Sequence, residues 1–282
     1  MPMMKSERGG SQGRAKKRFG QHFLEHAWAQ KVIRAIAPLP DQTFFEIGPG
    51  RGAITEMLAA AAQRVVAFEI DRDLAASLRQ ERLRNVRVIE GDFLSVRPGD
   101  LRETIAVDDP APIAIRVAGN LPYNVASPIL FKLVELYGQG IPFTDATVML
   151  QREVATRLTA SPGNKDYGVL TILIGRHASI EPVLQLPAGA FRPMPKIQST
   201  LVRLRFHMAS PPVQDDRVFE AVTQAIFTRR RKTLANALLA YPLNPAQSPA
   251  KVLSSAGLDP RRRPETLTLQ ELARLSDSVG TP

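Results

Sequence analysis

The stretch FFEIGPGRG, residues 44–52, decides the fold class. An apolar, strand-like run over residues 43–47 leads into three closely spaced glycines, and an alanine-rich helix is expected from residue 53. Glycines at a strand-to-helix turn let a ligand approach the backbone closely, and the start of the following helix favours negative charge. On its own, such a loop is equally typical of a plain tight turn, so its meaning depends on what surrounds it.

Short apolar runs alternate with helical patterns on both sides of this loop. The apolar runs predict strands at residues 43–47, 64–68, 86–89, 112–118, 146–150 and 199–206. The amphipathic or alanine-rich stretches predict helices at residues 27–37, 53–62, 72–82, 128–137 and 152–159, whereas residues 169–186 fit either state. This repeated strand–helix order predicts an α/β fold with a Rossmann-like, mainly parallel sheet and helices on both of its faces.

The pattern changes after a proline-containing linker at His207–Pro212. Beyond it the strand signals stop, and helical spacing recurs at residues 218–226, 232–239, 250–256 and 269–276. The first residues of the chain are rich in Gly, Ser and basic side chains, which favours a mobile arm. We therefore predict a flexible basic arm over residues 1–15, a Rossmann-like domain over 16–207 and a small helical domain over 208–282.

The charge of the chain indicates a polyanionic partner. Its 282 residues include 37 Lys and Arg against 27 Asp and Glu, a net charge of +10. Basic residues gather at 5–18, 229–232 and 261–263, which favours nucleic acid ahead of a membrane surface. The lack of cysteine excludes a disulfide scaffold, a cysteine zinc site and a thiol nucleophile. No apolar run approaches the roughly 18 residues of a membrane span, so a soluble, cytoplasmic protein is expected.

Acidic residues follow the next two expected strands. Glu69 ends the strand after the glycine loop, where an acid binds the ribose hydroxyls of NAD or of S-adenosylmethionine. Asp92 follows the strand after that and is placed to accept a hydrogen bond from an adenine amine, with Phe93 against the ring. The glycines lack the Gly-x-Gly-x-x-Gly spacing of a dinucleotide site. This difference favours S-adenosylmethionine, which carries no phosphate.

The segment GNLPY, Gly119–Tyr123, stands at the end of the fourth expected strand and is by itself compatible with a simple Asn-Pro turn. The exocyclic amine of adenine is a poor nucleophile because its lone pair is delocalised into the ring. The Asn120 side-chain oxygen and the Leu121 carbonyl are two acceptors for its N–H groups. Pro122 fixes the turn that aims them, and Tyr123 offers a face to a flipped-out base. Methyl transfer from a sulfonium then requires orientation rather than a strong base, and the four histidines show no metal-binding spacing.

With these motifs in place, the chain resembles, over nearly its whole length, the ribosomal RNA adenine dimethyltransferases, and among them the small-subunit (16S) enzymes. The resemblance implies S-adenosylmethionine as the methyl donor and dimethylation of the N6 amines of two adjacent adenosines. These lie in a hairpin loop near the 3′ end of 16S rRNA in the maturing 30S subunit, and a monomeric enzyme is implied. The segments that carry the resemblance are Lys17–Leu24 (KRFGQHFL), Glu46–Gly50 (EIGPG), Asn120–Tyr123 (NLPY), Phe191–Ser199 (FRPMPKIQS) and Arg230–Leu234 (RRKTL).

The resemblance also implies roles for individual residues. It puts His22 and Leu24 at the methionine end of the cofactor, and Phe191 on the target adenine opposite Tyr123. Many relatives have Asn in place of His22, so we expect cofactor affinity to depend on pH at this side chain. The remaining cofactor contacts implied are Gly48, Gly50, Glu69, Asp92, Phe93 and Asn120. The RNA phosphate contacts implied are Lys17, Arg18, Lys196, Arg230, Arg231 and Lys232.

Three alternative functions remain open at this point. The first is the related antibiotic-resistance type that acts on large-subunit RNA, although Leu121, Tyr123 and the Lys-Arg-Phe-Gly-Gln start favour the small-subunit type. The second is a ribosome-assembly factor that binds without methylation as its main task. The third is an NAD-dependent oxidoreductase, which rests on the glycine loop alone and leaves the NLPY segment and the basic runs without a purpose.

Overall fold

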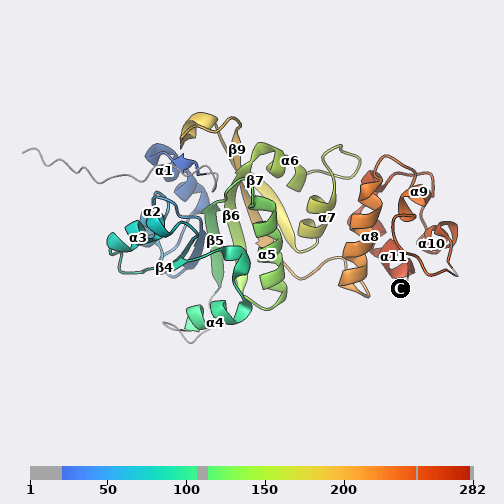
Figure 1. Cartoon of the computed structure of the whole chain (residues 1–282), viewed down its shortest axis with the longest axis horizontal. Coiled ribbons are helices and arrows are strands. Elements are labelled where there is room, and N and C mark those ends of the chain that lie inside the picture. The colour runs from blue at the N-terminus through green and yellow to red at the C-terminus, as the bar shows by residue number, and fades with distance from the viewer. Residues whose placement is uncertain (1–20, 107–113, 246, 280–282) are drawn as a thin grey trace, which may run out of the picture.

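The computed structural model describes residues 21–106, 114–245 and 247–279 (Figure 1). The expected basic arm over residues 1–15 lies outside these ranges, as do Lys17 and Arg18 and the first two residues of the expected strand at 112–118. Within the described ranges, no helix has the length and apolar character needed to cross a membrane.

A seven-stranded sheet forms the centre of the larger part of the molecule, with the strand order β4-β3-β2-β5-β6-β9-β7. The first five strands in this order run parallel, and the last two pair antiparallel. The chain moves outward from β2 to β3 and β4 and then returns to place β5 on the other side of β2, so the strand order reverses between β2 and β5. The bounds are β2 Thr43–Ile47, β3 Arg64–Glu69, β4 Val86–Glu90, β5 Ile115–Asn120, β6 Phe143–Gln151, β7 Ala178–Leu186 and β9 Ser199–Phe206.

Helices cover both faces of this sheet. Strand β2 is buried on both faces: Phe44 packs with Ala29 and Leu58 on one side, and Phe45 packs with Leu133 on the other. A central parallel strand buried in this way has a continuous apolar sequence, as TFFEI has. Helices α1 His26–Ile36 and α2 Thr55–Ala61 lie on the Phe44 face, and α4 Pro98–Ala106 and α5 Ala126–Gly138 on the Phe45 face. The other helices here are α3 Arg72–Gln80, α6 Arg152–Leu158 and α7 Val169–Gly175.

A second, two-stranded sheet joins the start of the described chain to a distant segment. Strand β1 Phe23–Leu24 pairs antiparallel with β8 Phe191–Arg192, so that Phe23 is opposite Arg192 and Leu24 is opposite Phe191. Two-residue strands are too short to leave an alternating pattern, so this pair could not be predicted from the sequence. Short 3-10 turns lie at η2 Phe93–Ser95, η3 Ala188–Ala190 and η4 Pro264–Thr266.

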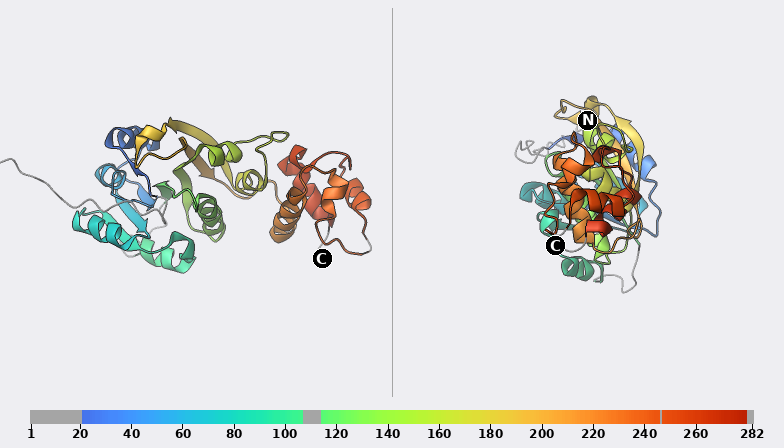
Figure 2. Two further views of the ribbon diagram at one scale, coloured as in Figure 1. Left: turned by 45° about the horizontal axis from the view of Figure 1, so that its top comes forward. Right: turned by 90° about the vertical axis from the view of Figure 1, so that its right-hand side faces the viewer.

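The C-terminal part is a small helical unit at one end of the molecule (Figure 2). It contains α8 Asp216–Thr228, α9 Leu234–Leu238, α10 Pro249–Ser255 and α11 Leu269–Val279 around a core of its own. Tyr167 and Ile172, which precede the linker, belong to that core, and the Tyr167 hydroxyl donates to the Leu267 carbonyl (2.9 Å). Arg176 forms a 2.7 Å ion pair with Asp216. The helical unit is therefore joined to the first part through α7 and the turn before it.

The expected fold class is confirmed, with one region resolved that the sequence left open. Residues 169–186 divide into α7 and the edge strand β7, which pairs antiparallel with β9. The expected strand at 146–150 is longer and begins at Phe143. Each of the other expected elements within the described ranges is present, with ends displaced by a few residues.

Candidate functional site

A cavity of about 350 Å³ opens where the strand order reverses, at the carboxyl ends of β2, β3, β4 and β5. Ligands of open α/β sheets bind at this position, and the volume lies within the roughly 300–1,000 Å³ of ligand pockets. The cavity brings together five separate sequence segments that the motifs singled out, together with Arg192. Those expected from the sequence and found in its wall are His22, Leu24, Gly48, Gly50, Glu69, Asp92, Phe93, Asn120, Leu121, Pro122 and Tyr123.

The glycine loop after β2 lines this cavity with backbone, because its conformation disfavours residues with a side chain. Gly48 and Gly50 have φ values of 70° and 61°, in the left-handed region that favours glycine. A Cβ on Gly48 would lie 3.5 Å from the Asn120 carbonyl oxygen, and one on Gly50 would lie 3.2 Å from the Phe23 ring. The loop therefore keeps its backbone open to a ligand and close to the segments that carry Phe23 and Asn120.

Glu69 is held rigidly at the end of β3. Its carboxylate is 4% exposed and accepts hydrogen bonds from the backbone N–H groups of Gly50 (2.9 Å) and Asp71 (2.8 Å). Burial raises the pKa of Glu69, while these two hydrogen bonds oppose the rise. Asp71 in turn caps α3 and accepts a hydrogen bond from the Gln21 side chain (3.1 Å). A fixed carboxylate of this kind is suited to the two hydroxyls of a ribose.

The same hydrogen bond also favours S-adenosylmethionine over NAD. A pyrophosphate binds to the free N–H groups of a glycine loop and the helix that follows. Here the Gly50 N–H is already engaged by the Glu69 carboxylate. A phosphate group beside Gly50 would face the negatively charged carboxylate of Glu69. A nucleoside with a positively charged sulfonium has neither problem, so the residues fit S-adenosylmethionine.

Asp92 and Phe93 form the wall beyond β4. Asp92 is exposed, and its carboxylate caps the following 3-10 turn by accepting from the Leu94 N–H (2.9 Å). Phe93 is 4% exposed and packs edge-on against Phe68, with ring centroids 5.2 Å apart. The Phe93 ring thus belongs mainly to the core and contributes one edge to the cavity.

Asn120 ends β5 directly above the glycine loop. The preceding residue must be glycine, because a Cβ on Gly119 would lie 2.4 Å from the Ile47 carbonyl oxygen on β2. The Asn120 side-chain NH₂ donates to the His22 carbonyl (2.7 Å). Since a carbonyl only accepts, this contact fixes the orientation of the amide. The amide oxygen Oδ1 is therefore the part of the group that remains as an acceptor at the cavity.

Tyr123 and His22 form a stacked pair at the cavity mouth, with ring centroids 5.4 Å apart and an interplanar angle of 27°. The Tyr123 hydroxyl forms a 2.7 Å hydrogen bond with the Ser199 hydroxyl. Burial raises the pKa of Tyr123 against the effect of this bond, so the phenol is neutral at physiological pH. His22 Nδ1 lies 2.7 Å from the Pro193 carbonyl and must carry a proton to donate to it.

Phe191 does not occupy the position that the sequence led us to expect. Its side chain is fully buried in the core cluster that also contains Leu24, Met149 and Leu201. The cavity wall includes the neighbouring Arg192 instead of the Phe191 ring. The expectation that Phe191 stacks on the target adenine is therefore not met in this structure, because the ring is enclosed by other apolar side chains.

The basic residues expected to contact RNA divide into two groups. Lys196, Arg231 and Lys232 are exposed. Arg230, in contrast, forms a 2.9 Å ion pair with Glu265 and donates to the Lys165 carbonyl (2.5 Å). These contacts tie Arg230 to the helical unit and to the turn before α7, whereas Arg231 and Lys232 have exposed side chains; phosphate binding by Arg230 stays a prediction.

The EIGPG segment also contains a buried acid to which the sequence motifs assigned no role. Glu46 lies within β2, directly before the glycine loop, and is 1% exposed. Burial raises its pKa to about 8, Thr55 opposes the rise, and Glu69 adds to it. Within the described part of the chain its Oε2 atom has no hydrogen-bond partner. An acid in the middle of an otherwise apolar strand was the signal that marks this position.

These features define a class of protein. A parallel sheet that ends in the antiparallel strands β9 and β7, a glycine loop at the point where the strand order reverses, and fixed carboxylates after the next strands identify a class I S-adenosylmethionine-dependent methyltransferase. The chain belongs to the ribosomal RNA adenine dimethylase family, whose sequence profile matches residues 12–275. It is accordingly a ribosomal RNA adenine dimethyltransferase.

Individual relatives agree with this assignment. The ribosomal RNA small subunit methyltransferases A of Myxococcus xanthus (strain DK1622) and of Nitrosococcus oceani are both 41% identical to this chain. The alignments cover 95% and 93% of this chain and 92% and 95% of the relatives. Among solved structures, a dimethyladenosine transferase from Plasmodium falciparum shares the fold, with a TM-score of 0.73, 23% identity and coverage of 90% of this chain and 96% of that one. The 23S rRNA methyltransferase ErmE gives a TM-score of 0.62 and 25% identity, with 91% and 99% covered.

Proposed function

We propose that this enzyme dimethylates the N6 amines of two adjacent adenosines in a hairpin loop near the 3′ end of 16S rRNA, within the 30S subunit or its precursor. The observation that carries the proposal is the fixed amide of Asn120, whose NH₂ is held by the His22 carbonyl at the cavity. The choice of the small subunit is supported by relatives that are 41% identical over nearly the full chain and carry that substrate in their names.

The cavity residues would hold S-adenosylmethionine by its nucleoside and its methionine ends. Glu69, fixed by two backbone N–H groups, is placed for the ribose hydroxyls, and Asp92 for the adenine amine. His22 and Leu24 also line the cavity, together with the loop at Gly48, and would hold the methionine end. When bound, the cofactor supplies a methyl group on a positively charged sulfur.

Asn120 and its neighbours would orient the target amine. The Asn120 Oδ1 atom and the Leu121 carbonyl accept the two N–H groups of adenine and localise the nitrogen lone pair toward the methyl donor. Tyr123 offers its ring face to the extruded base, with its hydroxyl anchored on Ser199. After the first transfer one N–H group remains, and a single acceptor is sufficient to hold the amine for the second.

The RNA around the target base would be held through its phosphates. Lys196 lies in the segment after β8, the strand whose Arg192 lines the cavity, and Arg231 and Lys232 lie on the helical unit. Exposed cations on separate elements suit recognition of RNA by the shape of its backbone. We include in the proposal that residues 208–282 act as an RNA-binding unit and that the enzyme works as a monomer.

The decisive experiment is transfer of labelled methyl groups to purified 30S subunits from cells that lack the modification, followed by mapping of the modified bases. We expect two dimethylated adenosines in the 3′ hairpin of 16S rRNA. Transfer to large-subunit RNA instead, or no incorporation into either subunit, would overturn the proposal. If the Asn120→Ala variant supports subunit maturation as well as the wild type, the main task is assembly rather than methylation.

A further inference from the structure

Strand β5 contacts the N-terminal segment of the described chain at both of its ends. At the carboxyl end, the Asn120 amide donates to the His22 carbonyl. At the other end, Arg116 donates to carbonyl groups at the C-terminal end of α1. Helix α1 begins four residues after His22, so β1 and α1 together span the length of β5 from the cavity to the far edge of the sheet.

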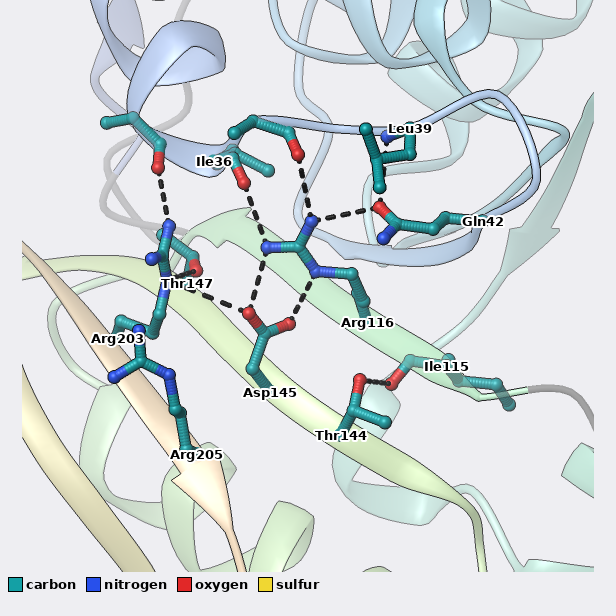
Figure 3. A network of polar contacts seen from close by, with 12 residues as sticks. Ile36, Leu39, Gln42, Ile115, Arg116, Thr144, Asp145, Thr147, Arg203 and Arg205 are labelled. Atoms are coloured by element: carbon teal, nitrogen blue, oxygen red, sulfur yellow. Dashed lines mark hydrogen bonds and ion pairs between the residues drawn. The ribbon is translucent and has the colours of Figure 1, made fainter.

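The Arg116 side chain is 12% exposed and uses its whole guanidinium (Figure 3). Its Nε and Nη2 atoms each donate to one carboxylate oxygen of Asp145, at 2.8 Å. Nη2 also donates to the Ile36 carbonyl (2.8 Å), and Nη1 donates to the Ala37 carbonyl (3.2 Å) and to the Gln42 side chain (2.9 Å). This fork geometry cannot be reproduced by the single ammonium of lysine.

A second arginine completes the same attachment. Arg203 on β9 donates from Nη2 to the Ala35 carbonyl (2.5 Å) and lies 3.7 Å from Asp145. The last carbonyls of a helix have no partner within the helix and carry partial negative charge. Two guanidinium groups therefore hold three consecutive carbonyls at the end of α1, and Asp145 on β6 binds both guanidiniums to the sheet.

Helix α1 is the rigid element that connects this attachment to the cavity. Helix α1 has 11 residues and is about 16 Å long. At its N-terminal end the Glu25 N–H donates to the Ala190 carbonyl, and β1 continues directly to His22. The position of α1 therefore sets the position of the His22 carbonyl, which is the group that orients the Asn120 amide.

We propose that Arg116 is a positioning residue for methyl transfer, acting through α1 and the His22 carbonyl on the Asn120 amide. The inference rests on the role proposed above for Asn120. It concerns how that role is maintained over the roughly 16 Å length of α1, which one helix bridges without a chain of mobile side chains. A shift of α1 would turn the amide away from the orientation in which Oδ1 faces the substrate.

The test compares Arg116→Lys with a matched control, Arg64→Lys. Arg64 also donates its guanidinium to carbonyls at the C-terminal end of a helix, those of Thr104 and Ile105 on α4, but α4 contributes no residue to the cavity wall. We expect Arg116→Lys to lower the single-turnover rate at saturating S-adenosylmethionine at least tenfold and to weaken S-adenosylhomocysteine binding several-fold. Arg64→Lys should change both less than twofold at a similar loss of Tm.

Two further readouts keep the result interpretable. The chain has a single tryptophan, Trp28, and it lies on α1, so its fluorescence reports the packing of this helix without any need for activity. A change in Trp28 emission and in S-adenosylhomocysteine affinity would support the positioning role even if the wild type proved to methylate another RNA. If Arg116→Lys does not fold, Arg203→Lys should show the same effects at smaller size. Equal rates and affinities for the Arg116 variant and its control would overturn the inference.

Discussion

At the scale of the residue, the site depends on the adjacent residues Gly119 and Asn120, which are constrained for different reasons. Gly119 is required by contact between strands, because any Cβ would collide with the Ile47 carbonyl. Asn120 is half-buried, and its side-chain NH₂ donates to the backbone carbonyl of His22. The glycine therefore allows β2 and β5 to pair, while the asparagine contributes little to that pairing and is available for chemistry.

Asn120→Ala should abolish most methyl transfer while leaving the protein folded. The variant loses the amide oxygen that accepts the adenine N–H, and loss of a positioned polar group of this kind costs on the order of 100-fold or more in rate. We expect Tm to change by no more than a few degrees and 30S binding to be retained. A single-turnover assay and a binding assay with the same subunits measure the two effects, and joint loss of both would argue against separate roles.

Glu46 gives a second prediction at this scale, on the dependence of stability on pH. Its pKa is raised from 4.5 to about 8, so the folded state keeps a proton that the unfolded chain releases. The stability due to this group is fully present below pH 4.5 and is lost as the pH rises toward 8. Glu46→Gln should match the wild type near pH 5 and exceed it at pH 9, by on the order of a few kcal/mol. Urea unfolding across this range tests it, and parallel pH profiles would contradict the assignment.

At the scale of the element, the central strands could be predicted from the sequence because their burial leaves a continuous apolar run, as in TFFEI. Strand β7 could not be predicted in this way. It lies at the sheet edge, its apolar residues alternate irregularly, and it contains Pro182, which an edge strand tolerates. The β1–β8 pair and the contact between His22 and Asn120 join residues far apart in sequence. No local pattern carries such information, and this is also why the burial of Phe191 was not foreseen.

The contacts of Glu271 at the start of helix α11 predict how stability depends on pH. Glu271 accepts hydrogen bonds from the Thr268 N–H (2.8 Å) and from Arg262, and the contact with Arg262 lowers its pKa to about 2. A lowered carboxyl pKa contributes stability above pH 4.5 that is lost as the pH falls toward 2. Glu271→Gln should therefore destabilise the protein at pH 7, and the difference from the wild type should shrink as the pH falls through this range. Thermal unfolding at pH 7 and pH 3 measures it, and a constant difference would contradict the proposed cause.

At the scale of the whole molecule, the net charge of +10 is not used uniformly. Arg230 and Arg262 stand within basic runs, yet they bind Glu265 and Glu271 and stabilise the helical unit. Backbone contact between Leu234 and Arg262 brings the two runs of this unit side by side. The surplus that remains for RNA is therefore smaller than the sequence suggests, and the paired arginines can be distinguished from the exposed cations by experiment.

Arg231 and Lys232 should contribute to the salt dependence of 30S or RNA binding. Each phosphate contact releases counterions, so affinity falls steeply with salt, and removing two contacts should reduce the slope of log K against log salt concentration by about 1 to 2. We expect this for Arg231→Ala combined with Lys232→Ala, with Tm nearly unchanged because both side chains are exposed. Arg230→Ala should instead lower Tm, because it leaves Glu265 without its partner.

A control of equal charge separates specific contacts from the general effect of net charge. Removing two exposed cations at Arg84 and Arg87, on the turn before β4 and on β4 itself, changes the total charge by the same amount. If the slope depended only on net charge, both double variants would reduce it equally. A larger reduction for the Arg231 and Lys232 pair would locate phosphate contacts on the helical unit. A salt dependence that is flat in the wild type would mean that the surplus charge does not hold the RNA.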